Sequence, residues 1–215
     1  MRRQKAIIFG AGGHAKVMLE VILQNDLIEV IGLLDPCRIK WGQRLLGVEV
    51  LGGDDLAAEL KSSGVSGFYI GLGSSGNLAP RKMLFQEAVR LGLKPLSVLH
   101  QTAIISKHAR IRPGVCVMAG AVVNPGARIG ADVCVNTAAV IEHDCLLGTH
   151  CFIGPGVRLG GAVVVGPSAF VGIGATVRHA IRIGSGALVG AGAVVVKDVL
   201  PKQLVVGVPA RPLKP

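Results

Sequence analysis

The chain is poor in aromatic and charged residues. Only 3% of its 215 residues are aromatic and 17% are charged, whereas 31 are glycine. Most globular cores depend on aromatic rings for much of their buried area, so this chain must fill its interior with small aliphatic side chains. The glycines lack the period of collagen, and half of the chain is hydrophobic, which argues against disorder. These absences favour thin, regular layers such as those of a solenoid.

Long hydrophobic runs are also missing. No stretch reaches the roughly 18 apolar residues that a membrane-spanning helix requires, so we expect no membrane segment. The basic start of the chain precedes the short apolar run Ala6–Phe9, which is too short for a signal peptide. We therefore expect a cytoplasmic protein.

The charge balance and the cysteines exclude further classes. The formal net charge is +10, but Lys and Arg are scattered without interleaved aromatics, so a nucleic-acid partner is not expected. Phosphorylated small molecules fit this charge better, with solubility as the alternative. The five cysteines show no zinc-type spacing, so neither a disulfide framework nor a metal site is expected.

Aliphatic residues recur at every sixth position in the second half of the chain. From Leu99 to Val195 each of these positions is Ile, Leu or Val, and a column four residues later holds small or β-branched residues. Helices repeat every 3.6 residues and antiparallel strands every two, so neither explains a period of six. A unit made of a short strand and a tight corner explains the period of six, and three such units close one triangular coil. We expect a β-solenoid over residues 99–200, followed by a tail at 201–215.

Residues 1–98 instead alternate between strands and helices. The pattern predicts strands at 5–9, 28–35 and 67–71, and helices that end near 24, 62 and 91. This alternation is typical of a Rossmann-like α/β domain with a parallel sheet. A glycine loop at 10–16 follows the first strand and opens a helix, a geometry that binds anions. Asp35 stands 20 residues after Ala15, where a ribose-binding acid is found in dinucleotide-binding proteins.

Two alternatives from other functional classes remain at this point. One is a nicotinamide-dependent oxidoreductase, although fewer than 100 residues precede the repeat, too few for the full two-half dinucleotide fold. The other is a nonenzymatic β-solenoid that serves as a scaffold. Arg81 is interpreted as a surface charge.

Three motifs carry a resemblance to a known family. They are the stretches Ile8–Lys16, Val135–Cys145 and Val206–Arg211. Nearly end to end, the chain resembles the sialic acid O-acetyltransferase/bacillosamine N-acetyltransferase family of sugar O- and N-acyltransferases. The resemblance implies a left-handed parallel β-helix after the Rossmann-like domain, and a homotrimer with active sites between neighbouring subunits.

The same resemblance implies the reaction. Acetyl-CoA would supply an acetyl group to the amine, at C4, of a nucleotide-linked dideoxy amino sugar, without a metal. Acetylation of a sugar hydroxyl, as in the sialic acid enzymes, is the alternative within the class.

The resemblance also assigns site residues. His143 is implied as the general base and Asp144 as the acid that orients it. The implied substrate contacts are Gly12, Gly13, His14 and Asp35. The implied acetyl-CoA contacts are Asn136, Phe152, Gly161 and Ile173. Phe152 stands where relatives often carry a second histidine that touches the acetyl group.

The residues themselves support this chemistry. His143 lies between two acids, and a neighbouring carboxylate raises the basicity of an imidazole and fixes its tautomer. Since eighteen residues make one coil, Gly161 is expected beside His143 and His179 one coil further on. Gly161 would leave room for a thioester and offer an N–H to the oxyanion. Cys145 and Cys151 fall in the inward column, which predicts direct transfer without an acyl-enzyme.

Overall fold

The computed structural model describes residues 3–213, and the chain forms two compact units. The first unit takes in the chain up to Gly73 together with Pro80–Val98, and the second takes in Ser74–Ala79 together with the chain from Leu99. Within the described residues, no helix has both the length and the apolar character needed to span a bilayer.

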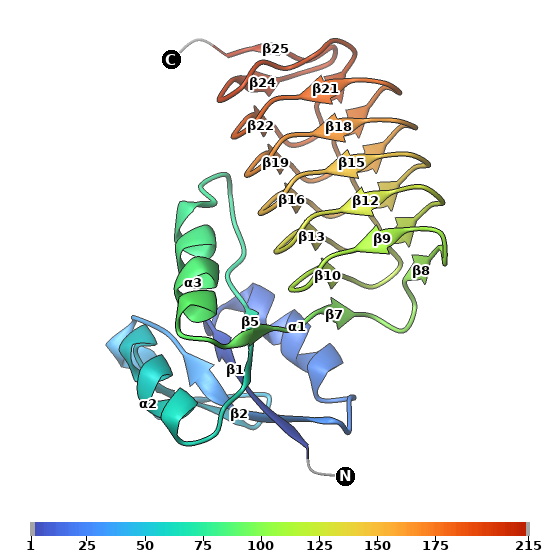
Figure 1. Cartoon of the computed structure of the whole chain (residues 1–215). Helices are drawn as coiled ribbons and strands as arrows, with labels where there is room; N and C mark the ends of the chain where they lie inside the picture. Colours follow the sequence, from blue (N-terminus) through green and yellow to red (C-terminus); the bar gives the residue numbers. More distant parts are fainter. Residues whose placement is uncertain (1–2, 214–215) are drawn as a thin grey trace. The chain divides into compact units, whose positions relative to one another are not determined.

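The first unit is a six-stranded sheet with helices on its faces (Figure 1). The strand order is β3-β4-β2-β1-β5-β6. The strands are β1 (Gln4–Phe9), β2 (Ile28–Leu34), β3 (Arg44–Leu45), β4 (Val48–Gly52), β5 (Gly67–Ile70) and β6 (Lys94–Pro95). The helices are α1 (Gly13–Ile22), α2 (Ala57–Ser62) and α3 (Ala79–Arg90), with short 3-10 turns η1 (Arg38–Lys40) and η2 (Asp54–Leu56).

Burial explains why these segments form a sheet and helices. The strand β1 lies between β2 and β5 and pairs with both in parallel, and its residues Ala6–Ile8 are fully buried. A continuous apolar run is what a strand covered on both faces requires. In α1 the buried residues, Ala15, Met18, Leu19 and Ile22, recur at helical spacing.

The strands and helices expected from the sequence are present, but three short strands were not predicted. The hairpin of β3 and β4 is antiparallel, so the sheet is mixed rather than wholly parallel. The strands β3 and β6 have two residues each, too few to show a periodic pattern.

The second unit is a triangular coil of two- or three-residue strands that stack into three sheets (Figure 1). Face 1 consists of β7 (Val98–Leu99), β10 (Cys116–Val117), β13 (Cys134–Val135), β16 (Phe152–Ile153), β19 (Phe170–Val171), β22 (Leu188–Val189), β24 (Leu204–Val206) and β25 (Arg211–Pro212). Face 2 consists of β8 (Ile104–Ile105), β11 (Val122–Val123), β14 (Val140–Ile141), β17 (Arg158–Leu159), β20 (Thr176–Val177) and β23 (Val194–Val195). Face 3 consists of β9 (Arg110–Ile111), β12 (Arg128–Ile129), β15 (Leu146–Leu147), β18 (Val164–Val165) and β21 (Arg182–Ile183).

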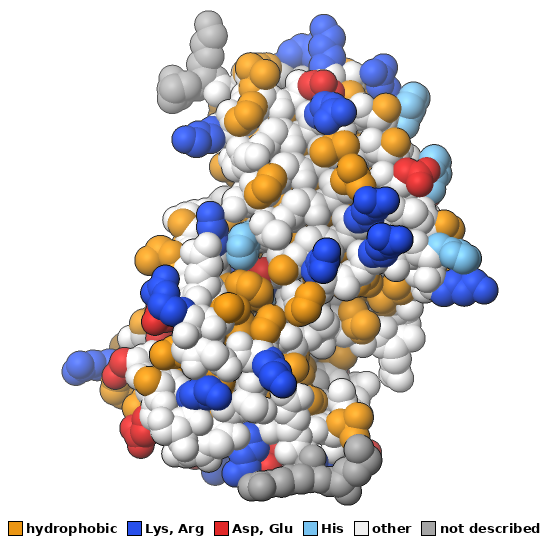
Figure 2. Space-filling model, in the orientation of Figure 1, with side chains coloured by type: hydrophobic (Ala, Val, Ile, Leu, Met, Phe, Trp, Pro, Cys, Tyr) orange, Lys and Arg blue, Asp and Glu red, His pale blue; other side chains and the backbone are white. Residues whose placement is uncertain are grey.

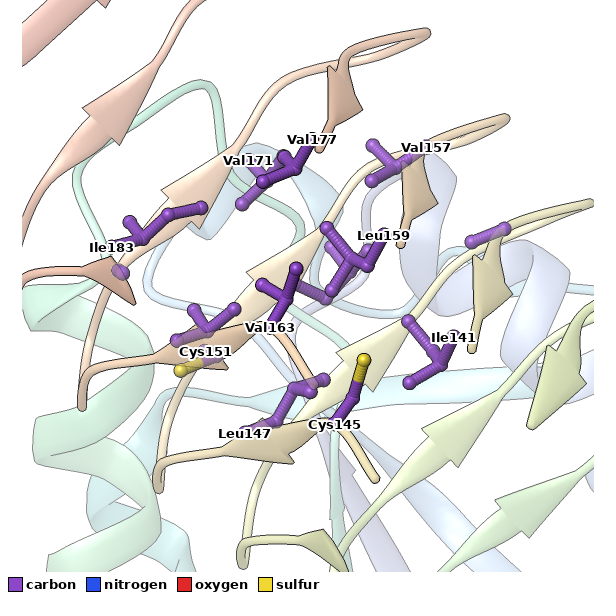
Figure 3. Close-up of a cluster of buried hydrophobic side chains, with 14 of the residues drawn as sticks. Ile141, Cys145, Leu147, Cys151, Val157, Leu159, Val163, Val171, Val177 and Ile183 are labelled. Carbon is purple, nitrogen blue, oxygen red and sulfur yellow. The ribbon is translucent and has the colours of Figure 1, made fainter. Parts of the chain in front are cut away.

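Between β7 and β23, strands that follow one another on the same face pair in parallel. The partners are eighteen residues apart, as in Ile141 with Leu159. The six-residue columns fill the interior, and Figure 3 shows Ile141, Leu147 and Cys151 among the side chains of this core. A Cβ on the corner residue Gly148 would lie 2.6 Å from the backbone of the next coil, so only glycine fits there. The repeat thus forms the β-solenoid that the six-residue period predicted, and the resemblance supplied its left-handed coiling.

The end of the chain adds to the β-helix. The strand β24 extends face 1, and β25 pairs with it in an antiparallel manner. An open solenoid end exposes unpaired backbone groups, and these last two strands cover part of it.

Candidate active site

The glycine loop of the first unit borders a pocket of about 930 Å³. Gly12 and Gly13 line it at the start of α1 and have open space around the position of a Cβ. The free N–H groups of a helix start and its dipole together favour an anion. The loop residues predicted to bind substrate therefore do line a cavity, together with His14 and Asp35.

Asp35 organises this pocket from the end of β2. Its carboxylate accepts hydrogen bonds from the N–H of Ala11 at 2.9 Å and of Cys37 at 3.0 Å, and from Lys40 Nζ at 2.8 Å. Burial acts to raise the pKa of Asp35, but these hydrogen bonds outweigh it and hold the pKa below its usual value. The carboxylate thus stays charged and fixes the glycine loop.

The interpretation of Arg81 as a surface charge was wrong, because this side chain is buried. Its side chain is only 2% exposed, and one guanidinium nitrogen donates to the carbonyls of Ile70 and Leu72, each at 2.9 Å. These carbonyls lie where β5 ends and need a donor from outside the sheet. The sequence pattern of the helix that contains Arg81 gave no sign of this contact.

His14 lies half-buried next to the loop. Burial, and secondarily the positive charge of Arg81, lower the pKa of His14 from 6.5 to about 4. At neutral pH the ring is therefore uncharged, with one nitrogen as donor and the other as acceptor.

In the second unit, His143 occupies the corner between faces 2 and 3, immediately after β14 and Glu142. Its Nδ1 lies 2.9 Å from Asp144 Oδ2, which leaves Nε2 as the other ring nitrogen. A Cβ placed on Gly161 would lie 2.5 Å from that Nε2. The position of Gly161 one coil beyond His143, expected from the eighteen-residue period, is confirmed by the hydrogen bond from Ala162 N–H to the His143 carbonyl at 2.9 Å.

Neighbouring polar groups hold this corner. Asn124, one coil earlier, donates from Nδ2 to Glu142 Oε2 at 3.0 Å. The same carboxylate oxygen accepts the N–H of His143 at 3.3 Å. Sequence reasoning missed Asn124, although it stands eighteen residues before Glu142 and the coil period marks such pairs. The side chains of His143 and Asp144 remain 62% and 68% exposed, so a substrate can reach them.

A groove of about 510 Å³ on face 1 contains two of the residues predicted to bind acetyl-CoA. Phe152 stacks on Phe170 at 5.6 Å between ring centroids, and Ile173 lines the same groove with an exposed side chain. Asn136 stands at the same corner, where its N–H donates to the carbonyl of Ile153 in the next coil at 3.0 Å. This apolar groove fits a flexible aliphatic arm, whereas Gly161 lies at the other corner of face 2.

The inward cysteines behave as the sequence predicted. Cys145 and Cys151 are fully buried, and their thiols donate to the carbonyls of Gly160 and Gly166. Burial is the main cause that raises the pKa of Cys145 to about 11 and of Cys151 to about 12, so neither is a thiolate nucleophile. Among residues 3–213, no group of three or more His, Cys, Asp or Glu side chains is placed to hold a metal ion.

Comparison with known proteins agrees with this arrangement. The PglD N-terminal domain matches residues 5–88, and the bacterial transferase hexapeptide repeat matches residues 126–161. A crystal structure of a histidine variant of perosamine N-acetyltransferase from Caulobacter crescentus, in complex with CoA and GDP-perosamine, is 35% identical with a TM-score of 0.91. The match covers 98% of this chain and 97% of that chain. The chain belongs to the PglD-like N-acetyltransferase family.

A second member of the PglD-like family supports the assignment. The acetyltransferase domain of PglB from Neisseria gonorrhoeae, in complex with acetyl coenzyme A, is 34% identical with a TM-score of 0.88, and the match covers 98% of this chain and 100% of that domain. WeeI from Acinetobacter baumannii is 25% identical with a TM-score of 0.83, covering 97% of this chain and 99% of that chain. No curated protein matched significantly.

Membership of the PglD-like family settles the class. The chain is an acetyltransferase, and neither the nicotinamide oxidoreductase nor the nonenzymatic scaffold remains an alternative. Both family matches fall where the chemistry was expected, since the first spans the glycine loop and the second spans His143 and Gly161.

Proposed function

We propose that this chain transfers the acetyl group of acetyl-CoA to the C4 amine of a nucleotide-linked dideoxy amino sugar. The observation that carries the proposal is the exposed His143–Asp144 pair, in which Asp144 contacts Nδ1 and the ring edge with Nε2 lies against Gly161. Relatives of about 35% identity bind CoA, acetyl-CoA or GDP-perosamine.

The pocket of the first unit is assigned to the nucleotide part of the acceptor. The amides of Gly12 and Gly13 bind its phosphates, and neutral His14 donates one further hydrogen bond. Asp35 acts by fixing the loop through Ala11, and Lys40 beside it adds a positive charge.

His143 is the general base at the corner of the β-helix. Asp144 holds Nδ1–H, which presents the lone pair of Nε2 to the uncharged amine of the sugar. The amine nitrogen attacks the thioester carbonyl, and its proton passes to Nε2. The tetrahedral oxyanion then collapses, the carbon–sulfur bond breaks, and the coenzyme A thiolate takes the proton from His143.

Gly161 contributes through its backbone. Within the described residues its N–H donates to no acceptor, so it is available to the developing oxyanion. A preorganised donor of this kind stabilises a tetrahedral intermediate strongly. The missing side chain of Gly161 provides the space that the imidazole ring of His143 occupies, since a Cβ there would lie 2.5 Å from Nε2.

The transfer is direct, without an acetyl-enzyme. An acyl-enzyme would require a reactive thiol or hydroxyl close to His143. Cys145 is the nearest cysteine in the chain, but its thiol is fully buried, faces the core and has a pKa of about 11.

The homotrimer with active sites between subunits agrees with the positions of the two corners. His143 stands at one edge of face 2, while Asn136 and Ile173 stand at the other edge. The outward side chains of face 2 are mostly apolar, and Ile104 is 68% exposed. A second copy packed on face 2 about a threefold axis would bring one edge of each chain to the opposite edge of the next.

One assay tests the proposed reaction. Release of the free thiol of coenzyme A is followed with UDP-, GDP- and dTDP-linked 4-amino sugars, and with matched sugars that carry only hydroxyl groups. We expect turnover with an amino sugar on one of the three nucleotides. Turnover on a hydroxyl sugar alone would establish O-acetylation instead.

The expected cytoplasmic location stays a prediction.

A further inference from the structure

Three arginines gather on face 3 of the β-helix. Arg110 and Arg128 are direct partners in the parallel pairing of β9 and β12, and Arg112 follows two residues after Arg110. Adjacent parallel strands lie about 4.8 Å apart, so the two paired side chains start from neighbouring points on the same face. Like charges placed opposite each other in a sheet are unfavourable.

No acidic side chain offsets this charge. The outward positions of face 3 are Arg110, Arg128, Leu146, Val164 and Arg182, in that order along the stack. Three acids stand at the two flanking corners. Asp144 and Asp132 are paired with His143 and His150 at 2.9 Å, and Glu142 accepts hydrogen bonds from Asn124 Nδ2 and the N–H of His143. Within residues 3–213, no ion pair involves Arg110, Arg112 or Arg128. The cluster therefore has a repulsion that a bound anion would relieve.

The arginines border a groove rather than a flat surface. It has a volume of about 430 Å³, and its other wall is apolar. The apolar side chains of that wall include Leu146, Val164 and Pro167. Figure 2 shows Lys and Arg side chains next to one another over β9 and β12, with apolar side chains over the neighbouring strands β15 and β18. A charged side facing an apolar side suits a ligand that has both a phosphate and an apolar part.

One residue of the groove stands on the same coil as the proposed base, a short distance along the chain. Leu146, which lines it, is three residues after His143, and both belong to the coil that runs from β14 to β15. The corner residues that line the groove, Gly130, Gly148 and Gly166, follow the strands of face 3 and so stand at the edge of this face opposite His143.

We propose that Arg110, Arg112 and Arg128 form a binding site for a phosphate group of one of the two substrates. Guanidinium groups bind phosphate oxygens through paired hydrogen bonds, which makes arginine suited to this role. Both acetyl-CoA and a nucleotide-linked sugar carry phosphates, so the inference rests on the proposed function for the identity of the ligand. The short length of the cluster and the absence of aromatic residues beside it argue against a nucleic acid.

The first test compares two variants that lose positive charge on the same face. One is Arg110→Gln/Arg112→Gln/Arg128→Gln, and the matched control is Arg182→Gln, which lies on β21 outside the groove. Steady-state rates are measured while acetyl-CoA and the accepted amino sugar nucleotide are varied in turn. We expect the triple variant to raise the KM of one substrate at least tenfold, and the control to leave both KM values within twofold of wild type.

The outcomes identify the source of the phosphate. A higher KM for acetyl-CoA alone assigns the groove to the coenzyme, and a higher KM for the sugar nucleotide alone assigns it to the acceptor. If neither KM changes while the wild type is active, the groove is not a phosphate site and the proposed function still stands.

A binding measurement keeps the test independent of catalysis. Calorimetric titration of the full chain with adenosine 3′,5′-bisphosphate, GDP and UDP is compared between the wild type and the triple variant. We expect at least one of these probes to bind the triple variant tenfold or more weakly. Equal affinities of both proteins for all three probes would overturn the inference. Thermal unfolding checks that the variant is folded, and removal of like charges should not lower its midpoint.

Discussion

The two units hold their functional side chains in opposite ways. In the α/β unit, Asp35 and Arg81 are 6% and 2% exposed and are bound to backbone groups. In the β-helix, the side chains of His143 and Asp144 are 62% and 68% exposed. They stand on a corner and are not part of the hydrophobic core. The fold and the chemistry are thus coupled in the first unit and largely separate in the second. Substitutions should show this as a difference between loss of stability and loss of activity.

The largest effect is expected for His143→Ala. Loss of a general base lowers kcat by roughly 10²–10⁴-fold, whereas loss of an exposed corner side chain should leave the unfolding midpoint unchanged. Both quantities are measured on the same preparation. His179→Ala, at the equivalent corner two coils on, is the matched control with near-normal kcat. Turnover close to wild type in His143→Ala would exclude this residue as the base.

Arg81→Met should instead reduce stability. The substitution leaves the carbonyls of Ile70 and Leu72 without this donor, and buried groups left unsatisfied cost about 1–3 kcal/mol each. We expect the free energy of unfolding of the first unit to fall by about 2–4 kcal/mol. Urea unfolding is followed by the fluorescence of Trp41, the single tryptophan. Lys82→Met on the same helix is the control, and an equal loss in both variants would contradict the assigned role of Arg81.

Gly161→Ala should lower activity through geometry alone. The added methyl meets the ring of His143, and a displacement of about 1 Å at a reacting group can cost on the order of 10²-fold. We expect kcat to fall about 10–100-fold with no change in thermal midpoint. In the double variant with His143→Ala the methyl has no ring to displace, so a further loss of the same size there would argue against this mechanism.

The smallest effect concerns pH and His14. Its folded pKa of about 4 lies below the 6.5 of the unfolded chain, so the unfolded chain binds this proton first as the pH falls. The stability of the first unit should be full above pH 6.5 and should decline from 6.5 toward 4. Urea midpoints at pH 7, 6 and 5 measure the slope.

The matched variant for this pH dependence is His14→Gln, which lacks the titrating group. It should lose most of the slope between pH 6.5 and 4. Asp35 acts in a different window, because its pKa is depressed from 3.8 and the stability it provides is present above 3.8 and lost at lower pH. An unchanged slope in His14→Gln would place the pH dependence elsewhere.

The same contrast explains what the sequence could predict. In the β-helix one rule of six residues places the core, the corners and the stacking of Gly161 on His143. The catalytic roles of these residues come instead from the family resemblance. Asn124 and Glu142 are also eighteen residues apart, so the same period could have predicted their hydrogen bond. Arg110 and Arg128 are also eighteen residues apart, but the groove beside them depends on the outline of the side chains.

Less of the α/β unit than of the β-helix could be predicted from the sequence. Its main strands, helices and glycine loop follow from apolar runs and glycines, because these signals are local. The contacts of Arg81 with the end of β5 and of Asp35 with Ala11 join different elements of the unit, and no local pattern encodes them. The hairpin of β3 and β4 was missed in part because β3 has only two residues, whereas β4, with five, is longer than the predicted strand β5.

The stacking of equivalent corners every eighteen residues limits how this site can change. Adding or removing one whole coil keeps every column in register, whereas a shift of a few residues would turn core side chains outward. Because coils are about 4.8 Å apart, the length that an acceptor must span along the solenoid can change only in steps of that size. Smaller adjustments for a longer or shorter sugar require substitutions at the corner residues, because a change there does not disturb the core.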